Sequence, residues 1–380
     1  MERDVELQLI QRCLDQIERT PGDDAATRPD FEVPVAKYIE PEWYALEQER
    51  IFRAAPNLVC HVSEVAEPGS FVTREVAGLP VIVARDESGT LRAMLNVCRH
   101  RGAKVEQRDA GTCKRFVCPY HAWTYRTDGS LDRVRFQSGF PSLEIAETSL
   151  VRLPVVESAG LVWVIPDPDH VGPVEPLPDS LAREIESTGI GALAPYETST
   201  REWAANWKLI VDGGLEAYHF KIAHQRTVAQ FFLDTVSIFD NVDEHVRTVL
   251  PRVTFTQLGE RPPEKRNLRP HSNVLYSIYP NASLLVQPDH VVLVLLRPLA
   301  VDRTEISVTS LVPPGWEDSD KARGYWSANH QITNTTLEED FAIAELIHAG
   351  ASSGANETWR FASYEHALSR WHAMYDAKLA

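Results

Sequence analysis

The spacing of apolar positions changes along the chain. Near the N-terminus they recur at helical intervals, which predicts an amphipathic helix, at Val5, Leu9, Ile10, Cys13, Leu14 and Ile17. From about residue 51 to residue 165, apolar runs such as FVTREVAG and LPVIVARDESG are short and bounded by Gly, Asp-Gly or Ser-Gly. This pattern is typical of β-strands joined by tight turns. We therefore expect a helical lead-in over residues 1–50 and an all-β domain over 51–165.

A proline-rich strip, Pro166–Ser180, follows and predicts a linker or a surface crossing. Beyond it, several strand-like runs fall between residues 246 and 312. Helical spacing is found in three segments, 203–225, 320–349 and 360–378. A run of strands flanked by helices favours an α+β domain with an antiparallel sheet, here over residues 166–380.

The composition narrows the possible functions. The chain has 380 residues, and 38 basic against 54 acidic residues give a net charge of −16, which argues against binding to nucleic acid or anionic membranes. No apolar run approaches the roughly 18 residues that a membrane helix needs. The charged N-terminal stretch lacks the apolar segment of a secretory signal. These features predict a cytoplasmic protein with neither a membrane nor a nucleic-acid partner.

A first candidate metal site lies in the segment CRHRGAKVEQRDAGTCKRFVCPYH. The chain has 5 cysteines, a sparse, odd set that fits a reducing compartment rather than a disulfide framework. The segment places Cys98-x-His100 before Cys118-x-x-His121. Two hairpin tips with this spacing could present two thiolates and two imidazoles to one centre. A structural zinc site uses the same donor set, although zinc fingers typically open with Cys-x2–4-Cys.

The sequences CRHRG and CPYHAW resemble the Rieske [2Fe–2S] signature. The resemblance implies that Cys98 and Cys118 hold one iron and that His100 and His121 hold the other. Imidazole ligands raise the reduction potential above that of all-cysteine clusters, which suits a cluster that accepts electrons. Ten basic and four acidic residues between positions 92 and 135 give this region a local charge of +6. Either a docking face for an acidic electron donor or an ordinary solvated surface would account for it.

A second candidate site lies in ANWKLIVDGGLEAYHFKIAH, which ends in His219 and His224. Residues five apart do not share a helical face, so a helix must end or distort between them if both bind one ion. The surrounding pattern resembles the mononuclear iron motif of Rieske non-haem iron oxygenases, in the alpha subunits of aromatic-ring-hydroxylating dioxygenases. The resemblance implies that both histidines and one later carboxylate form a facial triad on Fe(II).

The later carboxylate is expected from TTLEEDFAIAELIHAG. Thr335 or Thr336 with the acids that follow resembles a capping box, which predicts a helix start here. The family pattern aligns with Asp340 as the ligand. Glu338 and Glu339 are the alternatives, although acids are common in any first helical turn.

Glu216 matches the acidic residue that bridges the two metal centres in the family. Electrons are thought to cross that carboxylate between neighbouring subunits, which implies a homotrimer. Many ring-hydroxylating members carry Asp here, whereas some members that act on quaternary ammonium compounds carry Glu. Asp212-Gly213-Gly214 also departs from the more usual Glu-Asn-aromatic sequence.

The resemblance implies a terminal oxygenase that has a helix-grip catalytic domain. It would use dioxygen and electrons that pass from NAD(P)H through a separate reductase or ferredoxin, because the chain lacks a Gly-x-Gly-x-x-Gly fingerprint. Hydroxylation of a small aromatic or apolar ring is the leading expectation. The alternatives are oxidation or N-dealkylation of a methylated amine and, more remotely, an electron carrier with a ligand-binding domain. Candidate pocket aromatics, each of which could equally be core, are Phe231, Phe232, Phe255, Tyr276 and Tyr279.

Overall fold

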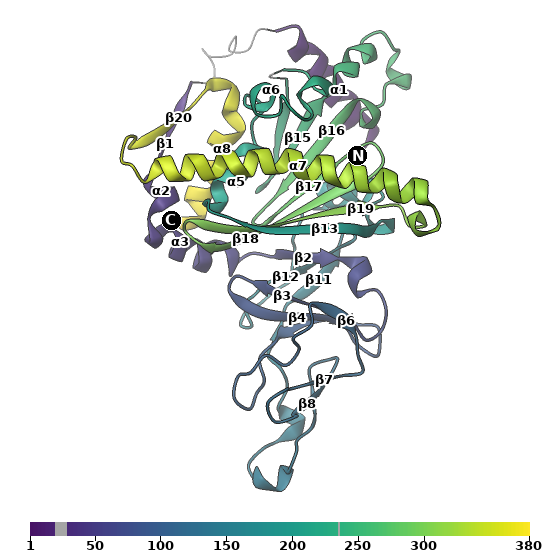
Figure 1. Ribbon diagram of the computed structural model, residues 1–380, viewed down its shortest axis with the longest axis vertical. Helices are drawn as coiled ribbons and strands as arrows, with labels where there is room; N and C mark the ends of the chain where they lie inside the picture. The colour runs from purple at the N-terminus through teal and green to yellow at the C-terminus, as the bar shows by residue number, and fades with distance from the viewer. Residues whose placement is uncertain (20–28, 235) are drawn as a thin grey trace. The chain divides into compact units, whose positions relative to one another are not determined.

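The computed structural model describes residues 1–19, 29–234 and 236–380. The chain forms two compact units (Figure 1): Gln48–Leu177, and Met1–Glu47 together with Pro178–Ala380. The unit boundary lies within the proline-rich strip. No helix in the described ranges is both long and apolar enough to cross a bilayer.

The unit Gln48–Leu177 is built from small antiparallel sheets, as its short apolar runs predict. A five-stranded sheet has the order β10-β5-β4-β3-β6, and two three-stranded sheets have the orders β11-β12-β2 and β7-β8-β9. Alternate residues of the strands enter a core that includes Phe71, Phe116 and Tyr125. The strands are β2 (Asn57–His61), β3 (Ser70–Val76), β4 (Leu79–Arg85), β5 (Leu91–Leu95), β6 (Ala110–Thr112), β7 (Arg115–Val117), β8 (Thr124–Arg126), β9 (Leu131–Arg133), β10 (Arg152–Leu153), β11 (Val155–Ser158) and β12 (Leu161–Val164).

The other unit is an α+β structure around a seven-stranded antiparallel sheet, which confirms the expected class. The sheet order is β13-β19-β18-β17-β16-β15-β14. Its strands are β13 (Ala194–Trp203), β14 (Ile238–Val242), β15 (His245–Pro251), β16 (Ser272–Ile278), β17 (Ala282–Val286), β18 (Val291–Ala300) and β19 (Arg303–Val312). The long helix α7 (Asp320–Ala351) runs across one face of this sheet in Figure 1, where Phe341 packs among Val292 and Val294. We call this face the helix-covered face.

We expect from the sequence a separate lead-in over residues 1–50. In the structure, Met1–Glu47 instead belongs to the sheet unit. Helix α1 (Arg3–Ile17) contacts β14, and its residues Leu9, Ile10 and Cys13 are buried. Strand β1 (Phe31–Pro34) pairs with β20 (Thr358–Phe361). Helices α2 (Ala36–Ile39) and α3 (Pro41–Glu47) follow, and α4 (Asp179–Glu186) opens the second part of the unit. The apolar face of α1 accounts for the difference, because it needs a partner to cover it.

Candidate functional site

The two cysteine-histidine loops close in the same way. The amide of Gly102 donates to the carbonyl of Cys98 at 2.9 Å, and the amide of Ala122 donates to the carbonyl of Cys118 at 3.0 Å. Both donors have positive φ, 77° at Gly102 and 58° at Ala122. The loops are therefore two versions of one tight turn, and each carries a cysteine at its start.

The four expected ligands of this unit come together in a way that fits a cluster. The thiols of Cys98 and Cys118 are free and buried, and the rings of His100 and His121 lie 4.6 Å apart between centroids. The Nδ1 atom of His121 is buried without a hydrogen-bond partner among the described residues. A buried polar atom without a partner is costly, so this nitrogen is suited to bind a metal. Two thiolates and two imidazoles are the donor set of a Rieske centre.

Tyr125, in β8, is a buried neighbour of this set that the motif did not reveal. Its hydroxyl accepts a hydrogen bond from the Arg99 amide at 3.0 Å and lies 3.3 Å from the Cys98 sulfur. Because the hydroxyl oxygen already accepts from Arg99, its hydrogen is available to the sulfur.

We expect Tyr125→Phe to lower the reduction potential of the cluster. A hydrogen bond to a ligand sulfur raises the potential, and a loss of about 1 kcal/mol corresponds to about 40 mV for one electron. A redox titration followed by electron paramagnetic resonance (EPR) measures the shift. An undiminished Rieske-type signal is the control for cluster assembly, and an unchanged potential would contradict the assignment.

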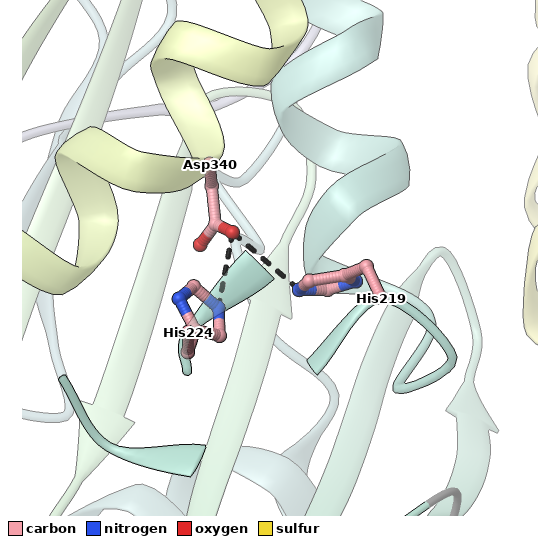
Figure 2. Close-up of side chains that lie close together, drawn as sticks. All are labelled: His219, His224 and Asp340. Atoms are coloured by element: carbon pink, nitrogen blue, oxygen red, sulfur yellow. Dashed lines mark ion pairs between the residues drawn. The ribbon is translucent and has the colours of Figure 1, made fainter. Parts of the chain in front are cut away.

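His219, His224 and Asp340 lie together although they come from distant parts of the sequence. Their candidate ligand atoms are all within 4.8 Å of one another. The Oδ1 atom of Asp340 is 3.4 Å from Nε2 of His219 and 3.1 Å from Nε2 of His224. Figure 2 shows the carboxylate, which projects from α7, facing both imidazoles.

The local chain path brings the two histidines together. Helix α5 (Trp207–Gly214) ends before them, and the short helix α6 (Phe220–Ala223) is flanked by His219 and His224. The sequence predicted one helix over 203–225. The helix is interrupted instead, as it must be if two histidines five residues apart are to bind one ion.

A carboxylate holds the second nitrogen of each imidazole. The Nδ1 atom of His219 pairs with Glu216, which also accepts from the His219 amide at 3.1 Å. The Nδ1 atom of His224 is 2.9 Å from Oε2 of Glu339, which accepts from the Thr227 hydroxyl at 2.7 Å. Carboxylate partners of this kind fix the tautomer and the orientation of metal-binding histidines.

The electrostatics of the site fit a cation. Burial by itself lowers the pKa of His219, but Glu216 and Asp340 outweigh it and raise that pKa. Burial likewise lowers the pKa of His224, and Asp340 and Glu339 raise it above its ordinary value. Asp340 lies at the Nε2 atoms, and Glu216 and Glu339 lie at the Nδ1 atoms of the same rings, so the group carries an excess of negative charge that a divalent ion would balance.

We expect Glu339→Gln to weaken Fe(II) binding about 10- to 100-fold, the usual effect of removing a partner that orients a metal ligand. Anaerobic Fe(II) titration of the metal-free protein measures the change. The matched control is Glu338→Gln, because Glu338 contacts the Asn334 amide at 3.2 Å and, among the described residues, no imidazole. Equal affinities for the two variants would show that Glu339 does not support the site.

The predicted helix start at Thr335 or Thr336 is wrong. Both residues lie inside α7, which begins at Asp320, and the hydroxyl of its N-cap Ser319 accepts from the Ala322 amide at 3.3 Å. Thr336 instead donates to the Ile332 carbonyl within the helix. A capping sequence marks a helix start only when the preceding residues are not helical, and here the preceding residues already belong to α7.

A cavity of about 430 Å³ adjoins His219 and Asp340. Asp212, Glu216 and Glu365 contribute carboxylates to its lining. Burial raises the pKa of Glu365, and Glu216 and Asp212 raise it further. Arg360 adds one guanidinium, so with Asp340 the lining has four carboxylates against one basic side chain, and the remainder is largely apolar. The cavity is therefore an acidic recess beside the histidines.

The departure at Asp212-Gly213-Gly214 has a clear local structure. The Asp212 carboxylate accepts from the Tyr38 hydroxyl at 2.6 Å and lies 3.2 Å from Nε2 of His372. At Gly213, a Cβ would meet no atom within 4 Å. Asp212 is thus anchored inside the unit, while Gly213 leaves space beside it.

The five candidate pocket aromatics separate into different environments. Phe255 is buried core, and Tyr276 is buried with its hydroxyl donated to Glu184 at 2.8 Å. Phe231 is exposed. Phe232 packs its ring 5.1 Å from that of Phe220, which lies 4.7 Å from the His224 ring. Phe232 is therefore connected to the His224 ring through the ring of Phe220.

Comparison with known protein families gives two matches. Residues 190–380 match the ring hydroxylating alpha subunit (catalytic domain) family, and residues 55–144 match the Rieske [2Fe-2S] domain. The first match covers the strand, helix and loop residues that bring His219, His224 and Asp340 together. The second covers both cysteine-histidine loops.

The chain is also similar to individual proteins. It is 34% identical over 213 residues to a carnitine monooxygenase oxygenase subunit of Acinetobacter pittii, a match over 55% of this chain and 57% of that protein. It is 30% identical over 257 residues to an anthranilate 1,2-dioxygenase large subunit of Acinetobacter baylyi, covering 65% of this chain and 54% of that protein. The chain thus spans little more than half the length of these relatives. A solved quaternary ammonium Rieske monooxygenase has a similar fold, with a TM-score of 0.81 and 24% identity over 96% of this chain and 100% of the other.

Proposed function

Because the chain belongs to the ring-hydroxylating alpha-subunit family and carries a Rieske [2Fe–2S] domain, we propose that it is the terminal oxygenase component of a Rieske non-haem iron oxygenase. The observation that carries the proposal is the group of His219, His224 and Asp340, whose ligand atoms lie within 4.8 Å of one another. Electrons come from NAD(P)H through a separate reductase or ferredoxin. The protein acts without a membrane or nucleic-acid partner, in the cytoplasm.

The two metal centres use different residues. Cys98, Cys118, His100 and His121 hold the [2Fe–2S] cluster, and His219, His224 and Asp340 hold Fe(II). When bound, the cluster supplies one-electron transfer and the iron supplies a site for dioxygen activation. Glu216 and Glu339 keep the Nε2 atoms of their histidines turned toward the metal.

Glu216 connects the site to a second copy of the chain. Its carboxylate lines the acidic cavity, whereas the loop that carries His100 is flanked by the exposed basic residues Arg99 and Arg101. Opposite charges favour docking of that loop of one subunit into the cavity of the next. Each subunit would then receive electrons from its neighbour's cluster. We propose a homotrimer, a ring in which every subunit has such a neighbour.

The substrate is a small aromatic or otherwise apolar ring, which the enzyme hydroxylates. The rings of Phe220 and Phe232 support this assignment, because they give the surroundings of His224 an apolar, aromatic character. The alternative is oxidation or N-dealkylation of a methylated amine. It is favoured by a glutamate rather than an aspartate at position 216 and by the similarity to carnitine monooxygenase subunits.

Metal analysis of anaerobically purified protein tests the proposal. We expect about three irons and about two acid-labile sulfides per chain, with a Rieske-type EPR signal after reduction. If two irons and two sulfides are found, the protein is reconstituted with Fe(II) and analysed again. A third iron that still fails to bind would favour an electron carrier with a ligand-binding domain.

A further inference from the structure

Arg252 follows β15 and shares the helix-covered face with the proposed iron site. Phe232 is its cross-strand neighbour in an antiparallel bridge, and the guanidinium carbon lies 5.5 Å from the centroid of the Phe232 ring. The Phe232 ring contacts Phe220, which in turn contacts His224. The guanidinium is therefore no farther than about 15 Å from the His224 ring, and aromatic surface lies between them.

The charge of Arg252 is not paired with a carboxylate. Both Nε and Nη2 donate to Oδ1 of Asn273, at 3.3 Å and 2.8 Å. Within the described ranges, no carboxylate is in ion-pairing distance of the guanidinium, and its Nη1 edge has no hydrogen-bond partner. Burial lowers the pKa of Arg252, against the attraction of Asp289 and Tyr325. A half-buried guanidinium ordinarily binds an anion.

Asp289 does not cancel this charge. Its carboxylate is occupied by Nδ1 of His290, at 2.8 Å, and by the Tyr325 hydroxyl. A second guanidinium nearby, that of Arg269, donates to two backbone carbonyls at 3.0 Å. Burial lowers the pKa of His290, and Arg269 and Arg252 lower it further despite the opposing effect of Asp289. Two guanidiniums, one carboxylate and a neutral imidazole leave an excess of one positive charge.

Apolar surface remains accessible next to Arg252. Leu250, Leu275 and Leu285 lie on the helix-covered face of three neighbouring strands, and each keeps part of its surface exposed. Gly214 lies over Leu275, and a Cβ there would be 3.7 Å from the leucine's Cδ2. Because the helices do not fully cover these leucines, the apolar part of a ligand can contact them.

We propose that Arg252 is the anchor for a carboxylate group of the substrate. The inference rests on the proposed function and narrows its substrate class. The carboxylate binds the free edge of the guanidinium, and the rest of the molecule lies along Phe232 and the accessible leucines toward the iron. Both an aromatic acid and a zwitterionic methylated amine meet this requirement, whereas a purely cationic amine would be repelled by the guanidinium.

The experiment measures dissociation constants by anaerobic calorimetry on the enzyme loaded with both metal centres. One arm compares benzoate with benzamide, and the other compares 4-(trimethylammonio)butanoate with its methyl ester. We expect the wild-type enzyme to prefer the acid about 10- to 100-fold in one arm, as for a hydrogen-bonded charge pair. The arm that shows the preference identifies the substrate class.

Arg252→Gln is expected to abolish this preference by weakening binding of the acid. Binding of benzamide should be unchanged, and the cationic methyl ester should bind no more weakly than to wild type, because the repelling guanidinium is gone. Arg252→Lys, which keeps the charge but not the fork of donors, should retain part of the preference and serves if the glutamine variant does not fold. The matched control is Arg297→Gln, because Arg297 is already paired with Glu305 at 2.7 Å.

The inference is overturned if wild type prefers neither acid, or if Arg252→Gln weakens binding of the acid and of its amide or ester counterpart equally. It is also overturned if Arg297→Gln abolishes the preference. Failure of the proposed function would be distinct, because it would appear as a missing third iron in wild type before any ligand is added.

Discussion

An Asp340→Ala enzyme is expected to lose its mononuclear iron and to turn over at least about 100-fold more slowly, while keeping its [2Fe–2S] cluster. The expectation follows from the position of Asp340 Oδ1, 3.4 Å and 3.1 Å from the Nε2 atoms of His219 and His224. Removing a residue that only orients a ligand costs about 10- to 100-fold, so removing the ligand itself should cost more.

Metal analysis and EPR together check this expectation. Iron should fall from about three to about two per chain, with sulfide unchanged at about two and the Rieske-type signal intact. The matched control is Asp320→Ala on the same helix, whose side chain is 97% exposed and contacts Arg323. A full complement of iron in Asp340→Ala would exclude this carboxylate as a ligand.

The candidate site was predictable where its residues are close in sequence. Each cysteine-histidine loop carries its ligands within four residues, and the turn that orients them is made locally. His219 and His224 are similarly close. Asp340 required a family pattern, because its position depends on how α7 packs. Glu339 was considered only as an alternative ligand, and its contact with His224 depends on the rotation of α7 about its axis.

Arg252 and Tyr125 show why other residues escape sequence analysis. Neither belongs to a motif, and each gains its significance from a neighbour on another strand or loop. Arg252 opposes Phe232 across a bridge, and the Tyr125 hydroxyl contacts Cys98. Pairing of this kind depends on strand register, which apolar spacing alone does not determine.

A strand was predictable from the sequence where its apolar residues form a clear run. The five strands from β15 to β19 bury apolar residues, and the apolar runs between 246 and 312 indicated them. Strand β13 was missed because it is an edge strand whose sequence, APYETSTREW, leaves most residues partly or fully exposed. Residues 253–257, predicted within a strand-like run, form a 3-10 turn instead.

A buried ion pair links the N-terminal segment to the helix that leads into the iron site. The Lys208 ammonium, on α5, pairs with the Glu47 carboxylate, and both side chains are fully buried. Glu47 also accepts from the Trp207 indole at 2.7 Å and from the Tyr375 hydroxyl on α8 (His366–Leu379). Burial lowers the pKa of Lys208, although Glu47 opposes the shift. Three separate segments therefore meet at one carboxylate.

We expect Lys208→Met to destabilise this unit by about 3–5 kcal/mol, because it leaves the Glu47 charge buried without its cation. Denaturant unfolding measures the loss. Lys378→Met is the matched control, since its pair with Glu244 is partly exposed and should contribute no more than about 1 kcal/mol. Adding Glu47→Gln to Lys208→Met should restore most of the stability, because the uncharged amide can still accept from the Trp207 indole through its oxygen and donate to the Tyr375 hydroxyl through its NH2 group. If the double variant is as unstable as Lys208→Met, lost packing rather than an unpaired charge accounts for the effect.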